Sequence, residues 1–415
     1  MAAHAGDEAA DWCVLAEAAV ALPPTSTLPR LRAEPKLPYI VDALRKLRAV
    51  YAPPPASVAP AVDEDLQNRL DAARAEPTER AYVLNWLGRL VESELAWIDD
   101  TPERRAAVED AAQILAGCTS ALEAGDLLRD FCFPTPDADV PPPFEGTPVL
   151  QVHMRVRDAS LPPSDQHSRQ GAAEAAAAVG VQTYASSIIM SDLFVRRPGA
   201  WHTALEPGAP RRAHFRAMEL GAGTGIVGMV VARALSEGVL PVDHATVGLT
   251  DYHADVLANL QYNVKHYLGL ASGRVTIECE PLDWRAMYDL VCPERASGAA
   301  VPCRLPPAHS YDLLLAADPV YDPMHATWLM GAISYLLVQP DVDPEARAHI
   351  LLPVRTAGRL AGLYKTVDEA LATHVPQNGF RLAVVHRAQW PRRHGLGRQD
   401  ESAYIWTALA WEALA

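Results

Sequence analysis

The chain has 415 residues, with 36 Lys and Arg against 51 Asp and Glu, which gives a formal net charge of −15. This acidic balance argues against broad binding to nucleic acid or to an anionic membrane surface, because a protein that tracks phosphates needs a basic face. An apolar content of 49% is ordinary for a folded globular chain, and the length predicts two or three domains.

Several simple classes of protein are disfavoured by local patterns. The six cysteines form no C-x-x-C pair and have no histidine spacing that would predict a zinc site or a disulfide framework. The acidic N-terminus lacks the basic and then apolar order of a signal peptide. The longest apolar stretch, residues 327–338, is shorter than the roughly 18 residues of a membrane span. We therefore expect a cytoplasmic, metal-free monomer without a membrane partner.

Residues 1–145 show no strand pattern and are predicted to form a helical domain. Apolar residues recur at three- and four-residue steps from Val83 to Trp97, which is typical of an amphipathic helix of about five turns. Thr101 is a good N-cap for a second helix, because Pro102 and Glu103 follow it in the first turn. A segment rich in proline and acidic residues, 134–148, is predicted to be the linker that ends this domain.

Residues 146–415 alternate between strand and helix patterns. Strands are predicted at 149–156, 214–220, 245–251, 274–280, 311–318 and 348–355, and a closing hairpin at 381–390 and 402–411. Nearly continuous apolar strands that alternate with helices predict a parallel sheet covered on both faces. The runs 160–179, 285–310 and 390–400 are interpreted as a surface loop, an insertion and a hairpin tip.

The most informative segment is a glycine-rich turn between a strand and a helix. The strand runs into Glu219, and Gly221, Gly223 and Gly225 follow before the helical pattern begins. Such a turn lets the backbone approach a ligand closely and exposes N–H groups at the helix N-terminus. A nucleotide-like cofactor is therefore predicted here. A dinucleotide site and a purely structural tight turn are the alternatives, although Ile226 occupies a position at which a dinucleotide turn has glycine.

Acidic residues follow the next two strands. Asp251 ends the second strand, where a carboxylate can accept two hydrogen bonds from a ribose; it could also be only the cap of the next helix. Asp283 and Trp284 follow the third strand and suit recognition of an adenine amine and ring, with packing against the sheet as the alternative for Trp284. Asp318 and Tyr321 follow the fourth strand and could flank a reactive nitrogen, or only mark the end of the strand.

Three motifs carry a resemblance to a known family. The string E-L-G-A-G-T-G at 219–225 resembles motif I of the seven-strand S-adenosylmethionine-dependent methyltransferases. D-x-x-Y at 318–321 resembles the signature of the family-16 methyltransferases, which mostly modify protein lysines. The segment around Tyr184 resembles the T-W-x-A-S segment of that family, with Tyr in place of Trp.

The resemblance implies a Rossmann-like class I methyltransferase core that uses S-adenosylmethionine and releases S-adenosylhomocysteine. The cofactor-binding residues that it implies are Tyr184, Glu219, Gly221, Gly223, Gly225, Asp251, Asp283, Trp284 and Asp318. Asp318 and Tyr321 are the implied catalytic residues, which would orient the lone pair of a lysine amine.

The helical region adds a looser resemblance to fungal protein-lysine methyltransferases that act on translation elongation factors. It is carried by Arg80-Ala81, Asn85-Trp86-Leu87, Ser93, Leu95 and Trp97-Ile98. This group implies elongation factor 2 or 3 as the protein substrate and the helical domain as the part that recognises it. Three rival functions stay open: a small-molecule N-methyltransferase, a non-catalytic scaffold that keeps the cofactor pocket, and a dinucleotide-dependent oxidoreductase.

Overall fold

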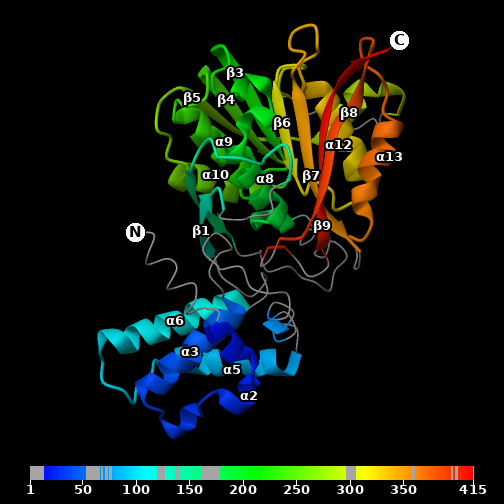
Figure 1. Ribbon diagram of the computed structural model, residues 1–415. Helices are drawn as coiled ribbons and strands as arrows, with labels where there is room; N and C mark the ends of the chain where they lie inside the picture. Colours follow the sequence, from blue (N-terminus) through cyan, green and yellow to red (C-terminus); the bar gives the residue numbers. More distant parts are fainter. Residues whose placement is uncertain are drawn as a thin grey trace. The chain divides into compact units, whose positions relative to one another are not determined.

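Two units of the chain fold around separate cores, one within Met1–Leu127 and the other within Leu128–Ala415 (Figure 1). The structure is a computed structural model. It describes residues 14–52, 66, 69–70, 73, 77–118, 127–135, 141–159, 178–295, 305–356, 360–393, 396–397 and 401–414.

The N-terminal unit is helical. Its elements are α2 (Pro24–Thr27), the 3-10 turn η1 (Leu31–Ala33), α3 (Leu37–Tyr51), α5 (Pro77–Ser93) and α6 (Pro102–Cys118). Helix α3 buries Ile40, Leu44 and Leu47, which lie on one face because they are spaced by three or four residues. The predicted N-cap of α6 is confirmed, since the Oγ1 of Thr101 accepts a hydrogen bond from the Arg104 amide at 3.2 Å.

The helix predicted from Val83 to Trp97 differs from the observed one at both ends. Helix α5 begins at Pro77 and ends at Ser93. It ends there because Glu94 and Leu95 have φ angles of 49° and 54°, a left-handed conformation that an α-helix cannot contain. Leu95 is nevertheless fully buried, so its apolar side chain serves the core of the unit from a turn rather than from the helix.

The C-terminal unit is built on the predicted sheet. The strands are β3 (Arg212–Leu220), β4 (Val242–Asp251), β5 (Val275–Pro281), β6 (Leu313–Ala317), β7 (Arg347–Arg355), β8 (Phe380–Pro391) and β9 (Glu401–Ala413). Their order across the sheet is β5-β4-β3-β6-β7-β9-β8; the first five are parallel, and β9 is antiparallel to both of its neighbours. The predicted α/β fold, including the closing hairpin, is confirmed.

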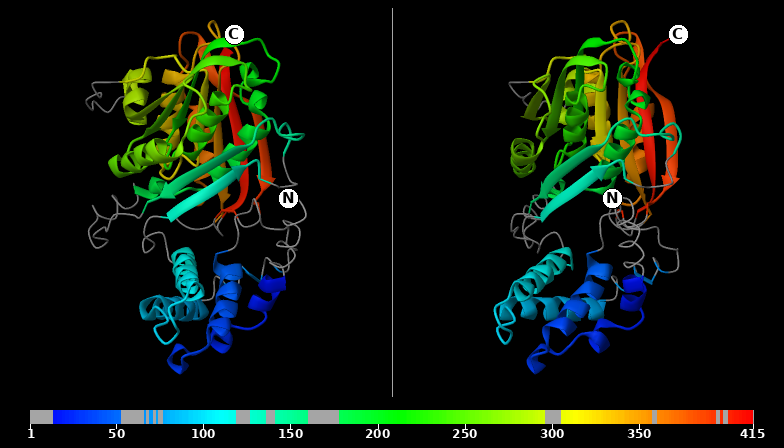
Figure 2. Two further views of the ribbon diagram at one scale, coloured as in Figure 1. Left: turned by 90° about the vertical axis from the view of Figure 1, so that its left-hand side faces the viewer. Right: turned by 60° about the vertical axis from the view of Figure 1, so that its left-hand side comes forward.

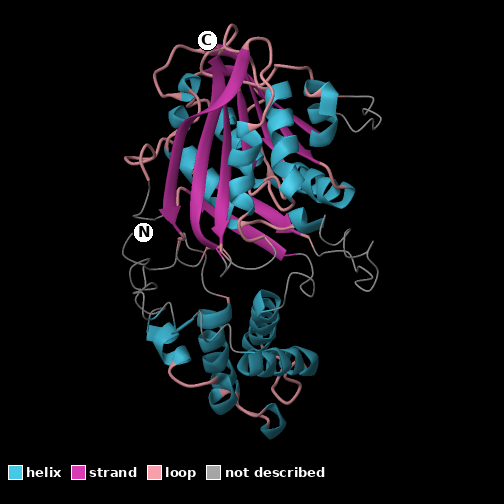
Figure 3. Cartoon of the chain, turned by 90° about the vertical axis from the view of Figure 1, so that its right-hand side faces the viewer, coloured by secondary structure: helices cyan, strands magenta, loops and turns pink. Residues whose placement is uncertain are grey.

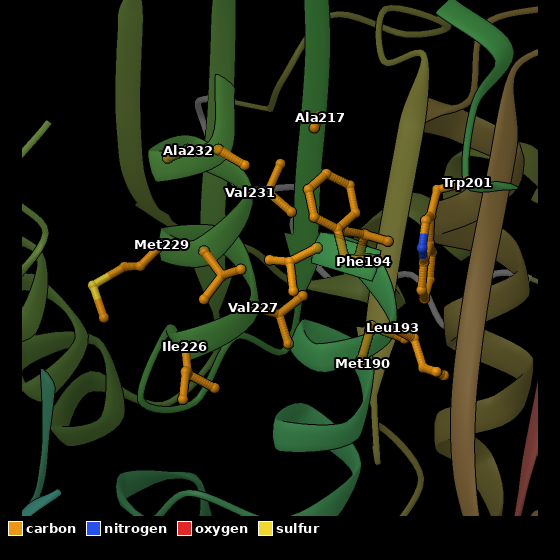
Figure 4. Close-up of a cluster of buried hydrophobic side chains, with 14 of the residues drawn as sticks. Met190, Leu193, Phe194, Trp201, Ala217, Ile226, Val227, Met229, Val231 and Ala232 are labelled. Carbon is orange, nitrogen blue, oxygen red and sulfur yellow. The ribbon is translucent and has the colours of Figure 1, made fainter. Parts of the chain in front are cut away.

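Helices cover both faces of this sheet (Figure 3). They are α8 (Ala185–Arg196), α9 (Ile226–Ser236), α10 (Ala254–Tyr267), α11 (Trp284–Val291), α12 (Pro323–Leu336) and α13 (Thr366–Ala372). One core contains side chains of α8, α9 and α10, and the other those of α11, α12 and α13. Strand β6 serves both, since Leu313 and Leu315 face one core and Leu314 faces the other. Figure 4 shows α8 and α9 meeting in the first core beside Trp201.

A smaller two-stranded sheet, β1 (Leu127–Phe133) and β2 (Val152–Asp158), accompanies the large one (Figure 2). Strand β2 packs against α9 and α10. The prediction of no strand before residue 145 is therefore wrong. Strand β1 escaped detection because it is mostly exposed or half-buried, so its sequence, LLRDFCF, has no clean alternation of apolar and polar residues.

The predicted linker 134–148 is not a free connection in its described part. Phe144 is fully buried, with its ring 4.8 Å from that of Trp406 and 5.5 Å from that of Trp201. The amide of Thr135 donates to the carboxylate of Asp192 in α8 at 2.5 Å. Prolines and acidic residues marked the turns of this segment correctly, but one aromatic side chain anchors it to the core. Residues 136–140 lie outside the described part.

The three predicted surface segments are described only in part. Residues 160–177 lie outside the described part of the chain, and 178–181 form the 3-10 turn η2 (Ala178–Val181). The supposed insertion at 285–310 begins inside helix α11, and 296–304 are not described. Within 390–400, only 390–393 and 396–397 are described. Among the helices built from described residues, none is long and apolar enough to cross a bilayer.

A buried histidine makes the stability of the fold sensitive to acid. The Nε2 of His349 lies 2.8 Å from the carbonyl oxygen of Trp201, and its Nδ1 accepts from the Trp406 indole at 3.1 Å. These partners favour a neutral ring with its proton on Nε2. Burial lowers the pKa of His349 from 6.5 to about 3. The unfolded chain therefore binds a proton that the folded chain does not, and stability is lost as the pH falls below 6.5.

We expect this group to remove about 3 kcal/mol of unfolding free energy between pH 7 and pH 4. Denaturant melts at both pH values would measure it. His349→Gln, which keeps one donor and one acceptor, should be less stable at pH 7 but lose much less on acidification. His214→Gln, at an exposed position, should behave as wild type. An equal acid loss in His349→Gln and wild type would contradict the assignment.

Candidate active site

The glycine turn lies at the point where the strand order of the large sheet reverses. Strand β3 has β4 on one side and β6 on the other. The chain passes from β3 through β4 to β5 on one side and then crosses to β6 and β7 on the other. In open α/β sheets this switch point is where a crevice forms outside the carboxyl ends of the strands, and ligands bind there. The predicted site residues on β3, β4 and β6 all follow or end these three strands.

Three glycines give the turn its shape. Gly221, Gly223 and Gly225 have φ angles of 69°, 57° and 85°, which residues with a Cβ rarely adopt. A Cβ on Gly223 would lie 2.9 Å from the carbonyl oxygen of Gly180, and one on Gly225 would lie 2.3 Å from a methyl group of Leu260. The turn thus passes close to other parts of the chain at Gly223 and Gly225, and the approach of a ligand to its backbone stays a prediction. Helix α9 starts immediately after it.

Glu219 binds the turn rather than lining its surface. The side chain is 2% exposed, and its Oε2 accepts a hydrogen bond from the Gly228 amide at 2.7 Å. Gly228 is the third residue of α9, whose N-cap is a glycine, so the carboxylate of Glu219 supplies the missing cap. Burial raises the pKa of Glu219 to about 8, and the charge of Asp251 adds to this effect.

Asp251 joins the end of β4 to the same turn. Its Oδ2 accepts from the Gly223 amide at 3.1 Å, and its Oδ1 accepts from the amides of Tyr252 and His253 at 2.8 and 3.2 Å. Burial raises the pKa of Asp251, and these hydrogen bonds oppose that shift. The next helix, α10, is capped by His253 rather than by Asp251. The helix-cap alternative for Asp251 is therefore wrong.

Asp283 and Trp284 differ in their surroundings. The carboxylate of Asp283 accepts from the amides of Arg285 and Ala286 and so caps helix α11. The Trp284 ring lies against the glycine turn, since a Cβ on Gly221 would be 3.2 Å from its nearest carbon. Trp284 also packs against the core on its side of the sheet. Packing against the sheet, the alternative for Trp284, is therefore confirmed, and recognition of an adenine ring by this residue stays a prediction.

Asp318 is held in a strained conformation by an ion pair. Its φ angle is 54°, in the left-handed region that aspartate tolerates better than most residues. Both carboxylate oxygens bind the Arg355 guanidinium, at 3.1 Å for Oδ1 to Nη1 and 2.5 Å for Oδ2 to Nη2. The side chains of Asp318 and Arg355 are only 10% and 5% exposed. The carboxylate is therefore fixed in place.

Tyr321 lies at the surface of the site. It is 39% exposed, and its ring meets that of His325 edge to face with centroids 4.2 Å apart. The His325 ring in turn lies 6.4 Å from that of Trp284. Partial burial raises the pKa of Tyr321 to about 12, and the charge of Asp251 contributes to the shift. Tyr321 thus offers a protonated hydroxyl beside the residues that follow β4 and β5.

The segment around Tyr184 is tied to the glycine turn by a neighbour. Tyr184 is the N-cap residue of α8. The hydroxyl oxygens of Thr183 and Thr224 lie 2.9 Å apart, and the Thr183 hydroxyl donates to Asp158 at 2.6 Å. This pairing brings 182–187 to the site.

Sequence reasoning missed Asp158, Arg355 and Glu401. Arg355 binds Asp318 directly, Glu401 binds Arg355, and Asp158 binds Thr183, the neighbour of Tyr184. Asp158 accepts two hydrogen bonds from Thr183 and forms an ion pair with Arg129. Arg355 ends a predicted strand, next to the strand that leads to Asp318. The signal for Arg355 in the sequence is a charged residue at the carboxyl end of a central strand.

The fold and the site define a doubly wound α/β domain with a nucleotide-type cofactor turn. Residues 170–342 match the sequence model of a lysine methyltransferase family, family 16. Protein-lysine N-methyltransferase EFM2 of Saccharomyces cerevisiae is 27% identical over 179 residues, which are 43% of this chain and 38% of that protein. The chain thus matches about two fifths of that relative's length. Over this segment the chain is similar to the family-16 lysine methyltransferases.

Solved structures of methyltransferases are similar only over part of the core. A putative S-adenosylmethionine-dependent methyltransferase from Streptococcus mutans is 8% identical, with a TM-score of 0.33, covering 63% of this chain and 53% of that one. The glycopeptide N-methyltransferase MtfA in complex with sinefungin is 11% identical, with a TM-score of 0.31, covering 59% and 98%. These scores are too low to support an argument about function.

The N-terminal unit contains a cavity of its own, of about 910 Å³. Residues around α2 and α3 line it, among them Leu22, Pro24, Lys36, Tyr39 and Lys46. Tyr39 is 67% exposed and Leu22 is 59% exposed. The lining also includes Asp42 and Glu79, so it offers charges of both signs beside apolar surface.

Glu219 yields a prediction about pH. Because its folded-state pKa of about 8 lies above the ordinary value of 4.5, the folded protein keeps a proton that the unfolded chain releases. Stability from this group is therefore full below pH 4.5 and is lost as the pH rises through 8. We expect Glu219→Gln to remove this dependence, so that the stability difference between variant and wild type changes by about 3 kcal/mol from pH 5 to pH 8.

Denaturant melts of both proteins at the two pH values would test this. The amide of Gln can still accept the hydrogen bond from Gly228, so the cap of α9 is retained. Glu237→Gln, at an exposed position paired with Arg233, serves as the control and should leave the slope unchanged. Parallel pH curves for Glu219→Gln and wild type would show that Glu219 is ionised in the folded protein at pH 7.

Proposed function

We propose that the protein is an S-adenosylmethionine-dependent protein-lysine N-methyltransferase. The observation that carries this proposal is the meeting of three strand ends at the switch point. The glycine turn follows β3, Asp251 ends β4, and Asp318 and Tyr321 follow β6. The match of residues 170–342 to a lysine methyltransferase family supports the same assignment.

The residues present fit the cofactor. The turn at 221–225 has glycine at three positions and Trp284 against it. The methionine and ribose parts of the cofactor can therefore approach its backbone closely. The acids Glu219, which is buried, and Asp251 hydrogen-bond to the turn, and a cation that approaches favours their charged forms. This environment suits a sulfonium and an ammonium group better than a pyrophosphate, which favours the methyltransferase over the dinucleotide enzyme. When bound, S-adenosylmethionine supplies an electrophilic methyl group.

The acceptor side must provide a neutral amine. A free lysine has a pKa near 10.4, so presenting the uncharged amine at pH 7 costs about 5 kcal/mol. Burial of the lysine lowers its pKa and reduces that cost. The Tyr321 hydroxyl, which stays protonated at pH 7, has an oxygen that can accept an N–H bond and orient the amine. Asp318, held by Arg355, contributes a fixed negative charge close by.

We further propose that the substrate is translation elongation factor 2 or 3 and that the N-terminal unit recognises it. The resemblance of residues 80–98 to the fungal enzymes that modify these factors supports the partner. The cavity beside α2 and α3, with Tyr39 exposed at it, supports a binding role for this unit, because exposed aromatic side chains are typical anchors of protein interfaces.

The first test is transfer of labelled methyl from S-adenosylmethionine to purified elongation factors 2 and 3, with the modified residue located by peptide mass spectrometry. We expect label on a lysine of one factor. Asp318→Ala should reduce kcat by about 100-fold, because one preorganised charge is lost, while cofactor affinity measured by calorimetry is retained. Asp368→Ala, which removes an exposed partner of Arg387, should leave both unchanged.

Each other outcome has a distinct meaning. Equal loss of cofactor binding and turnover in Asp318→Ala would move Asp318 to the cofactor side of the site. Label on small amines without a labelled protein would favour the small-molecule enzyme. Cofactor binding without transfer to any acceptor would favour the scaffold.

The role of the N-terminal unit is tested in the full chain. Tyr39→Ala removes an exposed ring at the cavity and is expected to raise KM for the intact factor by about 10-fold with little change in kcat. Val342→Ala, at an exposed position in the other unit, should change neither constant. An unchanged KM in Tyr39→Ala would remove this cavity from the recognition surface.

A further inference from the structure

We propose that Arg355 is a positioning residue of the acceptor site, which, with Glu401 and Tyr404 of β9, fixes the Asp318 carboxylate beside the amine to be methylated. This inference rests on the proposed methyl transfer. It concerns how the chain holds one of its own groups in place.

The first link is the two-pronged contact between Asp318 and Arg355. The guanidinium uses both terminal nitrogens, so the carboxylate can neither rotate nor shift without breaking a hydrogen bond. The backbone is held too, since the Asp318 amide donates to the Leu351 carbonyl of β7 at 2.8 Å. A left-handed φ costs about 1 kcal/mol or more and persists only where the surroundings impose it.

The second link holds Arg355 itself. Its Nη2 donates to Oε1 of Glu401 at 2.9 Å, and the Tyr404 hydroxyl donates to Oε2 of Glu401 at 2.8 Å. Glu401 is 3% exposed, so the chain of contacts is removed from solvent from Asp318 to Tyr404. Burial by itself lowers the pKa of Arg355, but the carboxylates of Asp318 and Glu401 outweigh that effect and raise the pKa above its usual value, so the guanidinium stays charged.

A β-bulge brings Glu401 into place. Along the β7–β9 ladder Val354 pairs with Ala403, whereas Arg355 pairs with Glu401, so Ser402 is an extra residue. In a regular ladder Ser402 would stand opposite Arg355. Bulges re-aim side chains in this way and are frequent beside active sites. The β7–β9 ladder thus departs from regular pairing where it reaches Arg355.

Stability alone does not account for this cluster. Removing two carboxylates and a guanidinium from water costs more than their attraction reliably returns, and apolar replacements of such buried pairs are often equally stable. The contacts join the carboxylates of Asp318 and Glu401 to one guanidinium, so the Asp318 carboxylate is fixed at the carboxyl end of β6. A fixed negative site at this edge attracts a lysine ammonium and keeps its nitrogen in one place.

Arg355→Lys is the variant that tests the proposal, because it keeps the charge and loses the two-pronged geometry. We expect kcat for the protein acceptor to fall by about 10- to 100-fold, as small displacements of positioning groups do. Cofactor affinity, measured by calorimetry without acceptor, should stay within about threefold, and hydrogen exchange of the Asp318 amide should become faster. Arg381→Lys, in an exposed pair with Glu412 on the same hairpin, is the matched control and should change none of these.

A second variant guards against misfolding of Arg355→Lys. Tyr404→Phe removes only the hydroxyl that holds Glu401 and is expected to lower kcat by about 3- to 10-fold. Wild-type kcat in either folded variant, or a loss of turnover matched by loss of cofactor affinity, would overturn the positioning role. Absence of methyl transfer by the wild-type enzyme would instead overturn the proposed function, so the two failures are distinguishable.

Discussion

The arrangement of the site depends on two carboxylates that bind the backbone of the glycine turn. Glu219 caps α9 through the Gly228 amide, and Asp251 accepts from the Gly223 amide. The glycines at 221, 223 and 225 take left-handed φ angles and have no side chains with which to hold the turn, so most of its support comes from other segments. The ends of β3 and β4 supply the anchors instead. The start of α9, the approach of Gly180 and the contact with Trp284 all depend on this fixed loop.

Burying these carboxylates has an electrostatic consequence. Glu219 is nearly inaccessible and its pKa is raised to about 8, partly by the charge of Asp251, so the ligand-free site holds its two acids with less than two full charges at pH 7. A cation that enters lowers the pKa of both acids, and proton release then accompanies its binding. An anion that enters would instead raise the pKa of both acids, and proton uptake would accompany its binding. The local charge therefore discriminates between ligand classes before any specific hydrogen bond is considered.

The sequence predicted the central sheet because its strands are buried on both faces and read as continuous apolar runs, as in residues 313–317. It predicted the turn and the acids because they directly follow those strands. Strand β1 was missed because exposed and half-buried positions leave no periodic pattern. The Asp318–Arg355 pair spans 37 residues and the Arg355–Glu401 pair spans 46. Such contacts depend on strand order and on a bulge, and one sequence alone does not reveal them. Similarly, Phe144 lies in a segment rich in proline and acid, and only the packed core shows that it is an anchor.

The two named residues of D-x-x-Y are physically unlike each other, although the motif presents them as a pair. Asp318 is buried, strained and held by an ion pair, so it is unsuited to exchanging protons with a substrate. Tyr321 is partly exposed, with a hydroxyl that stays protonated near neutral pH. The rigid member can define where a nitrogen sits, and the accessible member can form and release a hydrogen bond to it. This division requires that rigidity be built into the fold, and the contact of β6 with β7 and β9 through Arg355 provides it.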